Sequence, residues 1–239
     1  MTWVLKVSVL WPALWAGLWV GACGGAAQDK PASPVAAVEP VEKDDGMVIA
    51  GAKGSLGWDE VKPVFEKHEA SLSRCYSEVV DEVGDFVGGK VRLDLSVRPD
   101  GSVGSVIVGE GDLGSQRVYR CLCREASLLK FPEPHGGETE VSYTMDLTSG
   151  EGAETPQIWT ADQMAESLGP LSSEISACLE GKTGVSLTLY VDRGGRVVEA
   201  GAASASPDLQ KGADCLATAA LRWSFPDPGK IPAKVTLRF

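Results

Sequence analysis

The segment Val91–Val97, with the sequence Val-Arg-Leu-Asp-Leu-Ser-Val, decides how the first half of this chain folds. Its alternation of apolar and polar residues predicts a strand with one buried face. The turn sequence Pro-Asp-Gly at 99–101 follows, so a second strand should begin at Val103 and complete a hairpin. The same strand and turn pattern recurs near the end of the chain, where Val185–Val191 alternates in the same way and a turn follows at 193–195.

The two hairpins belong to a longer internal repeat with a constant offset of 94 residues. From Val91 to the end of the chain the copies align without a gap, so Cys121 matches Cys215 and Phe131-Pro132 matches Phe225-Pro226. A period of this length is too long for a solenoid unit and has the size of a small domain. We therefore expect two related domains, at 58–148 and 158–239, joined by a linker at 149–157.

Each copy is expected to fold in the order α-β-β-α-β. Apolar residues at helical spacing predict a first helix in each copy, and Thr160 with Gln163 forms a capping box before the helix of the second copy. The stripe of the first copy comprises Val61, Phe65, His68, Leu72 and Cys75, and that of the second comprises Met164, Leu168, Leu171, Ile175 and Cys178. Second helices are predicted at Ser115–Leu129 and Leu209–Trp223, and last strands at Glu140–Leu147 and Lys234–Phe239.

The predicted fold class is therefore α+β, with a three-stranded antiparallel sheet and two helices on one of its faces in each domain. The first copy has nine more residues than the second between its first helix and first strand. These extra residues include Val83–Gly89, which we interpret either as a contact surface or as a spacer.

The repeat also predicts how the cysteines pair. Each copy has one cysteine in its first helix and one in its second, which predicts the disulfides Cys75–Cys121 and Cys178–Cys215. Closing loops of this length stabilises each domain by roughly 4 kcal/mol in the chain-entropy model. Cys123 has no counterpart in the second copy, where Ala217 stands. It is either a buried free thiol or a residue that contacts a partner.

The N-terminus is typical of an exported lipoprotein. Residues 1–22 have one early lysine and an apolar run, which predicts a signal peptide. Val20-Gly-Ala-Cys23 resembles a bacterial lipobox, so we expect Cys23 to be lipidated; the alternative is a secreted protein cut nearby. Gly24 favours the outer membrane, with the protein facing the periplasm. Residues 23–57 are rich in small residues and proline, which predicts a flexible tether.

Charge restricts the partners. The chain has a formal net charge of −11, which argues against binding to nucleic acid and to anionic membrane surfaces. After the signal peptide no apolar run is long enough to span a bilayer, so contact with the membrane is expected through the lipid anchor only.

Several of these motifs, taken in order, resemble a known family. The motifs are Cys75-Tyr76, Gly89-Lys90-Val91 at the start of a strand, Asp100-Gly101 in the turn, Cys121 in a helix and Phe131-Pro132-x-Pro134 before the last strand. Together they resemble the AgmX/PglI C-terminal domain, which is related in pattern to the TonB C-terminal domain. The second copy keeps the cysteines and Phe-Pro but lacks the tyrosine and Asp-Gly. The resemblance implies a periplasmic, non-catalytic interaction module, from a family named after gliding-motility machinery.

A search of the sequence for chemistry predicts no catalytic residue, metal site, cofactor or small-molecule substrate. His68 aligns with Leu171, which predicts a core position, and His135 lies in the loop Pro134–Gly137, which predicts a solvated turn. Cys121-x-Cys123 with a histidine could bind zinc, but the predicted disulfide competes for Cys121. Gly88-Gly89 lacks the residues that a phosphate-binding loop requires.

Two hypotheses of function follow. In the first, the chain is an interaction or scaffold lipoprotein for protein partners in the cell envelope, and an exposed sheet edge such as Glu140–Leu147 accepts a partner strand. In the second, it is an envelope thiol or hydrolytic enzyme that uses Cys123 or the His135 loop. A third hypothesis is that the domains only support another assembly mechanically, and the sequence pattern is the same for this hypothesis and the first.

Overall fold

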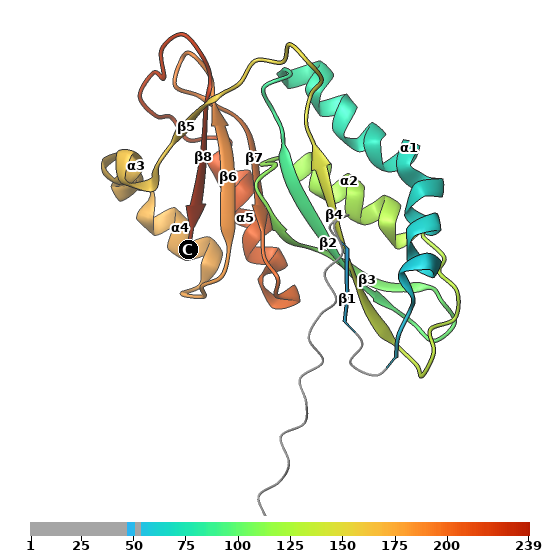
Figure 1. The fold of residues 1–239 in the computed structure, drawn as a ribbon. Coiled ribbons are helices and arrows are strands. Elements are labelled where there is room, and N and C mark those ends of the chain that lie inside the picture. The colour runs from blue at the N-terminus through green and yellow to red at the C-terminus, as the bar shows by residue number, and fades with distance from the viewer. Residues whose placement is uncertain (1–46, 51–53) are drawn as a thin grey trace, which may run out of the picture. The chain divides into compact units, whose positions relative to one another are not determined.

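The structure, a computed structural model, describes residues 47–50 and 54–239 (Figure 1). The predicted signal peptide at 1–22, Cys23 and most of the predicted tether lie outside the described residues. The described chain is a mixed α+β protein with two four-stranded sheets and two disulfides. None of the helices in this part of the chain is long and apolar enough to cross a membrane.

The first half builds a sheet with the strand order β1-β4-β2-β3, in which every neighbouring pair is antiparallel. Its elements are β1 (Met47–Ala50), α1 (Trp58–Val83), β2 (Gly89–Val97), β3 (Val103–Gly111), α2 (Gln116–Ser127) and β4 (Thr139–Leu147). Helices α1 and α2 lie side by side over one face of this sheet (Figure 1).

Local sequence explains these elements. On α1, the predicted stripe buries Val61, Phe65 and Leu72 against the sheet, while Pro63 stands in the first turn, where its missing N–H is tolerated. Along β2, every second residue from Val91 to Val97 is buried, as the alternation predicted. Ser115 caps α2 by accepting a hydrogen bond from the Val118 N–H at 3.3 Å.

The second half builds a sheet with the strand order β5-β8-β6-β7, in which β5 is parallel to β8 and the other pairs are antiparallel. Its strands are β5 (Gln157–Trp159), β6 (Ser186–Val191), β7 (Val197–Ala203) and β8 (Ala233–Arg238). Its α-helices are α3 (Ala161–Leu168), α4 (Ser172–Leu179) and α5 (Gln210–Ala220), with short 3₁₀ turns at Gly169–Leu171 and Pro207–Leu209. Each half therefore contains the predicted three-stranded antiparallel core and has its own cluster of buried residues.

The structure differs from the prediction in two respects. The first helix of the second copy is broken into α3 and α4, because Pro170 lacks the N–H that a continuous helix needs and restricts the residue before it. Each sheet also has a fourth, outer strand that the sequence did not predict. One of these strands, β1, is formed by Met47–Ala50, and Leu56 is buried, so the predicted tether at 23–57 extends too far.

Candidate protein-interaction site at the edge of the first sheet

Strand β4 is paired unequally on its two sides. On one side β2 pairs with all nine of its residues, from Thr139 to Leu147. On the other side β1 pairs only with Glu140–Tyr143. Within residues 47–50 and 54–239, no strand pairs with Thr144–Leu147 on the β1 side. We call these four residues the open segment of β4.

The open segment has an apolar face and a polar face, and an added strand with the same alternation would fit both. Val141, Tyr143, Met145 and Leu147 alternate along the helix-covered face; Val141 is 1% exposed, whereas the other three are only partly buried. The Tyr143 ring stacks on Phe65 with centroids 3.9 Å apart. The opposite face is polar and ends at the exposed Asp146. An unpaired edge beside a half-covered apolar row is the arrangement that recruits another strand.

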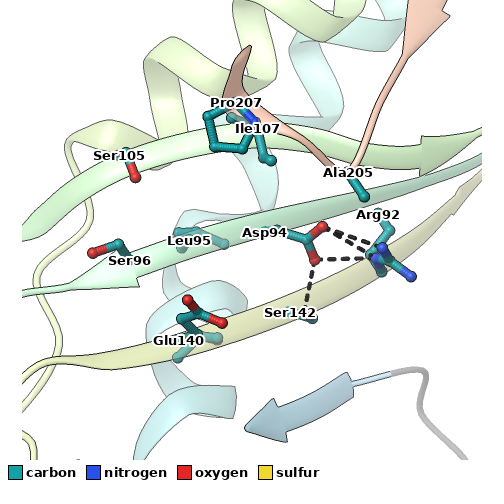
Figure 2. Close-up of a pocket in the computed structure, with 11 residues that line it drawn as sticks. Arg92, Asp94, Leu95, Ser96, Ser105, Ile107, Glu140, Ser142, Ala205 and Pro207 are labelled. Carbon is teal, nitrogen blue, oxygen red and sulfur yellow. Dashed lines mark hydrogen bonds and ion pairs between the residues drawn. The ribbon is translucent and has the colours of Figure 1, made fainter. Parts of the chain in front are cut away.

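The outer face of this sheet contains a hollow next to β4, lined by both polar and apolar residues (Figure 2). Arg92 lies 3.0 Å from Asp94 and 3.1 Å from Glu110, and the Ser142 hydroxyl donates a hydrogen bond of 2.7 Å to Asp94. These groups pair with one another across β2, β3 and β4, and Figure 2 shows Arg92, Asp94 and Ser142 side by side. Because its Arg92, Asp94 and Ser142 side chains already pair with one another, we regard the strand edge as the stronger candidate for binding.

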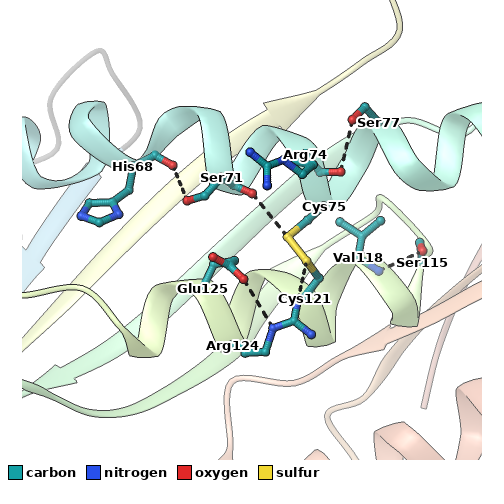
Figure 3. The surroundings of a disulfide bond; sticks show 10 residues. All are labelled: His68, Ser71, Arg74, Cys75, Ser77, Ser115, Val118, Cys121, Arg124 and Glu125. Carbon is teal, nitrogen blue, oxygen red and sulfur yellow. Dashed lines mark hydrogen bonds and ion pairs between the residues drawn. A yellow bond between two sulfur atoms is a disulfide. The ribbon is translucent and has the colours of Figure 1, made fainter.

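The two disulfides have the pairing that the repeat predicted. Cys75 of α1 is bonded to Cys121 of α2, with Cα atoms 5.6 Å apart (Figure 3). Cys178 of α4 is bonded to Cys215 of α5, with Cα atoms 5.4 Å apart. Each bond joins the two helices that cover one sheet, and so holds that helical layer together.

Cys123 is a free thiol on α2 and is partly buried. Burial, and secondly the nearby Asp214 carboxylate, raises the pKa of Cys123 to about 11. The thiol is therefore protonated at neutral pH, whereas the thiolate is the nucleophilic form.

The histidines lie apart from any described cluster of ligands. His68 is only partly buried, so the predicted core position is wrong: this side chain borders a surface hollow that Leu128, which is 71% exposed, also lines. His135 is exposed, as predicted for a turn, and its backbone forms a bridge with Ser55. Within the described residues, no group of three or more histidine, cysteine or acidic residues is arranged to bind a metal ion.

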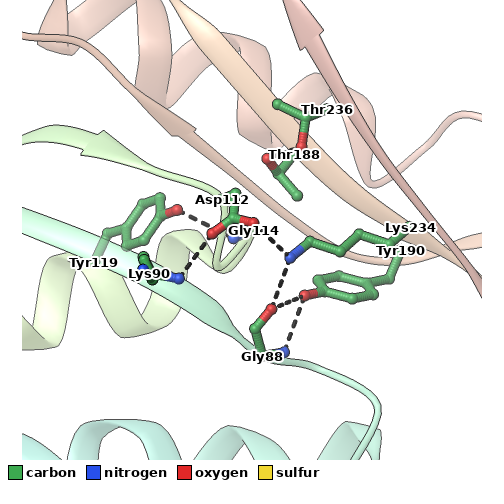
Figure 4. A network of polar contacts seen from close by, with 9 residues as sticks. All are labelled: Gly88, Lys90, Asp112, Gly114, Tyr119, Thr188, Tyr190, Lys234 and Thr236. Carbon is green, nitrogen blue, oxygen red and sulfur yellow. Dashed lines mark hydrogen bonds and ion pairs between the residues drawn. The ribbon is translucent and has the colours of Figure 1, made fainter. Parts of the chain in front are cut away.

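The Val83–Gly89 loop contacts the second half of the protein (Figure 4). The Tyr190 hydroxyl donates to the Gly88 carbonyl at 2.8 Å and accepts from the Gly88 N–H at 3.0 Å. Lys234 donates to the same carbonyl at 2.8 Å and lies 3.1 Å from Asp112. Burial is the largest cause of the raised pKa of Tyr190, whose side chain is fully covered. The extra residues of the first copy therefore serve as a contact surface within the chain.

A second contact between the halves is centred on the buried Glu199 of β7. Its carboxylate accepts hydrogen bonds from Ser115 at 3.0 Å and from Arg117 at 2.6 Å. The backbones approach closely here, because a Cβ placed on Gly201 would lie 2.5 Å from the Ser115 nitrogen. Only glycine fits this position without a shift of one half against the other.

Two features of the site were missed in the sequence. Met47–Ala50 is a short apolar run that could have indicated a strand, but its length and its place after Lys43–Gly46 made it resemble the tether. The sequence did not predict the residues that join the halves, because Tyr190, Glu199 and Gly201 belong to no periodic pattern or motif. Comparisons with protein-family models, curated proteins and solved structures find no match to this chain.

Proposed function

We propose that this protein is a non-catalytic lipoprotein of the cell envelope that acts as a protein-interaction or scaffold module. Its site is the edge of β4, which takes an extended segment of a partner protein by strand addition. The observation that carries the proposal is the open segment, Thr144–Leu147, which has no strand partner in the described chain and adjoins a half-covered apolar row.

The physics of a sheet edge supports this function. Unpaired N–H and C=O groups along a strand are a template for another strand, and soluble proteins usually protect such edges. An added strand would supply main-chain hydrogen bonds for affinity, while its alternate side chains would meet Met145 and Leu147 for specificity. The acidic balance of the chain, with a net charge of −11, favours partners with a basic or neutral segment.

The location in the envelope is part of the proposal. Two disulfides in one chain are typical of an oxidising compartment outside the cytoplasm. The lipobox-like Val20–Cys23 adds a lipid anchor, for which we propose the outer membrane and the periplasmic side. The resemblance of both copies to the AgmX/PglI C-terminal domain favours two tandem related domains and a partner in motility, transport or cell-wall machinery.

The alternative, an envelope thiol or hydrolytic enzyme, receives less support. A nucleophilic cysteine needs a lowered pKa, whereas the pKa of Cys123 is raised to about 11. His135 is 80% exposed and lies 3.9 Å from Glu60, in a turn that resembles a solvated surface. These observations favour binding over catalysis.

Site-directed photocrosslinking in living cells tests the proposal. A photoreactive phenylalanine analogue is placed at Asp146, which is exposed in the open segment, and in a matched control at Glu69, which is exposed on α1. We expect a specific protein adduct from position 146, identified by mass spectrometry, and none from position 69. Equal adducts at both positions, or none at either, would contradict strand addition at this edge.

A further inference from the structure

Strand β1 pairs with part of the proposed binding edge of β4, and this pairing is short. It contributes four residues, Met47–Ala50, whereas β2 pairs with β4 over nine. A partner strand of eight residues could pair with Glu140–Leu147 and would make about twice the ladder of hydrogen bonds that β1 makes. Such a strand and β1 cannot occupy Glu140–Tyr143 at the same time.

Residues 54–57, which precede α1, are anchored by contacts of their own with the rest of the fold. Ser55 and His135 exchange backbone hydrogen bonds of 2.9 Å in both directions, and Leu56 is 3% exposed. The Gly54 carbonyl accepts a hydrogen bond of 2.9 Å from the Thr139 hydroxyl, and the Gly57 N–H donates to Glu60 at 2.7 Å. These contacts hold the entry to α1 whether or not β1 is paired.

The register of β1 indicates what kind of strand would replace it. Met47 lies opposite Tyr143 and Ala50 opposite Glu140. In the same register, an added strand would place one residue opposite the exposed Asp146, where a basic side chain stabilises the strand pair. A foreign strand with a basic residue there, and apolar residues opposite Met145 and Leu147, would match the open segment, which has no strand partner among residues 47–50 and 54–239.

We propose that β1 is a displaceable strand that covers half of the binding edge until a partner strand replaces it. The partner is an extended protein segment of about eight residues, antiparallel to β4, with a basic residue opposite Asp146. This inference rests on the proposed function. It adds that β1 competes with the partner, so that the apparent affinity equals the intrinsic affinity multiplied by the fraction of molecules in which β1 is unpaired.

The test uses a synthetic octapeptide, Val-Lys-Val-Thr-Met-Val-Ile-Ala, whose last four residues repeat β1 and whose lysine would face Asp146. Its affinity is measured by fluorescence anisotropy with the full chain. A double variant, Val48→Pro with Ile49→Pro, weakens β1, because adjacent residues of a strand alternate in the direction of their N–H groups and proline has none. The matched control, Ala36→Pro with Ala37→Pro, places the same change before β1.

We expect the octapeptide to bind the Val48→Pro/Ile49→Pro variant at least about tenfold more tightly than the wild-type chain and the control variant. A peptide with aspartate in place of the lysine should bind more weakly to all three proteins. Equal affinity for the wild-type chain and the β1 variant would overturn the displaceable strand and leave strand addition standing. Absence of binding to every protein would overturn strand addition itself.

A second variant tests the displacement independently, in case the proline variant misfolds. Val48 and Ser142 lie directly opposite each other, so Val48→Cys with Ser142→Cys, made with Cys123→Ala, should form a disulfide that holds β1 in place. The locked protein, with its native disulfides confirmed by mass spectrometry, should bind the octapeptide at least about tenfold less tightly than the Cys123→Ala chain. Unchanged affinity of the locked protein would overturn the displacement.

Discussion

The close contact between the two halves predicts that a larger residue at Gly201 destabilises the protein. A Cβ at this position would lie 2.5 Å from the nitrogen and 2.8 Å from the carbonyl carbon of Ser115, which are backbone atoms that cannot move aside alone. Gly201→Ala should therefore force β7 away from the start of α2.

The magnitude follows from two opposing effects. At a position with room for a methyl group and an ordinary backbone conformation, glycine to alanine stabilises a protein by about 0.4–1 kcal/mol through the unfolded state. Overpacking of a tight contact costs about 1–3 kcal/mol. The contact at Gly201 is too close for a real Cβ, so the second effect should prevail, with a net destabilisation of roughly 1–2 kcal/mol. For a unit of this size the melting temperature should fall by roughly 2–8 °C.

Urea unfolding followed by circular dichroism, together with thermal melting, measures the effect. Gly150→Ala is the matched control, because nothing lies within 4 Å of its added Cβ and its φ is outside the left-handed region. The control should be neutral or slightly stabilised. The reasoning is refuted if Gly201→Ala is as stable as the wild-type chain, or gains stability as the control does.

Three further predictions concern stability and reactivity. Removing a disulfide by Cys178→Ser with Cys215→Ser should lower the free energy of unfolding by roughly 4 kcal/mol, measured by urea titration, and a loss below about 1 kcal/mol would contradict the loop-closure argument. Cys123 should react slowly with iodoacetamide in the native protein at pH 7–8 and faster as the pH approaches its pKa of about 11, because only the thiolate attacks; rapid labelling at pH 7 would revive the enzyme hypothesis. Tyr190→Phe should destabilise the protein by about 1–3 kcal/mol, because its hydroxyl bonds both to the N–H and to the carbonyl of Gly88; an unchanged urea midpoint would show that this contact contributes little.

The repeated elements could be predicted from the sequence because each is encoded locally. Alternation in Val91–Val97, helical spacing around Cys75 and the matching position of Cys121 carry enough information to set the strand, the helix and the disulfide between them. The constant offset then doubled the evidence, since a pattern that occurs twice in register is rarely accidental.

The remaining features depend on contacts between distant residues. Nothing near Gly201 or Glu199 announces that these residues meet Ser115. Likewise, Met47–Ala50 becomes a strand only because β4 offers an edge for it, and so the sequence predicted Glu140–Leu147 as open over its whole length. Pro170 could have predicted the break between α3 and α4, but the continuous apolar stripe from Met164 to Cys178 favoured a single helix.

Amide hydrogen exchange of the open segment is the direct test of strand addition at β4. In an antiparallel sheet, alternate residues of β4 direct their N–H groups away from β2, so half of the Thr144–Leu147 amides should face the proposed partner. NMR-detected exchange is measured residue by residue, with and without saturating octapeptide. We predict that the peptide slows exchange at alternate amides of Thr144–Leu147 and leaves exchange at the outer edge of β5 unchanged. Unaltered exchange in Thr144–Leu147, or protection that falls elsewhere on the protein, would contradict it.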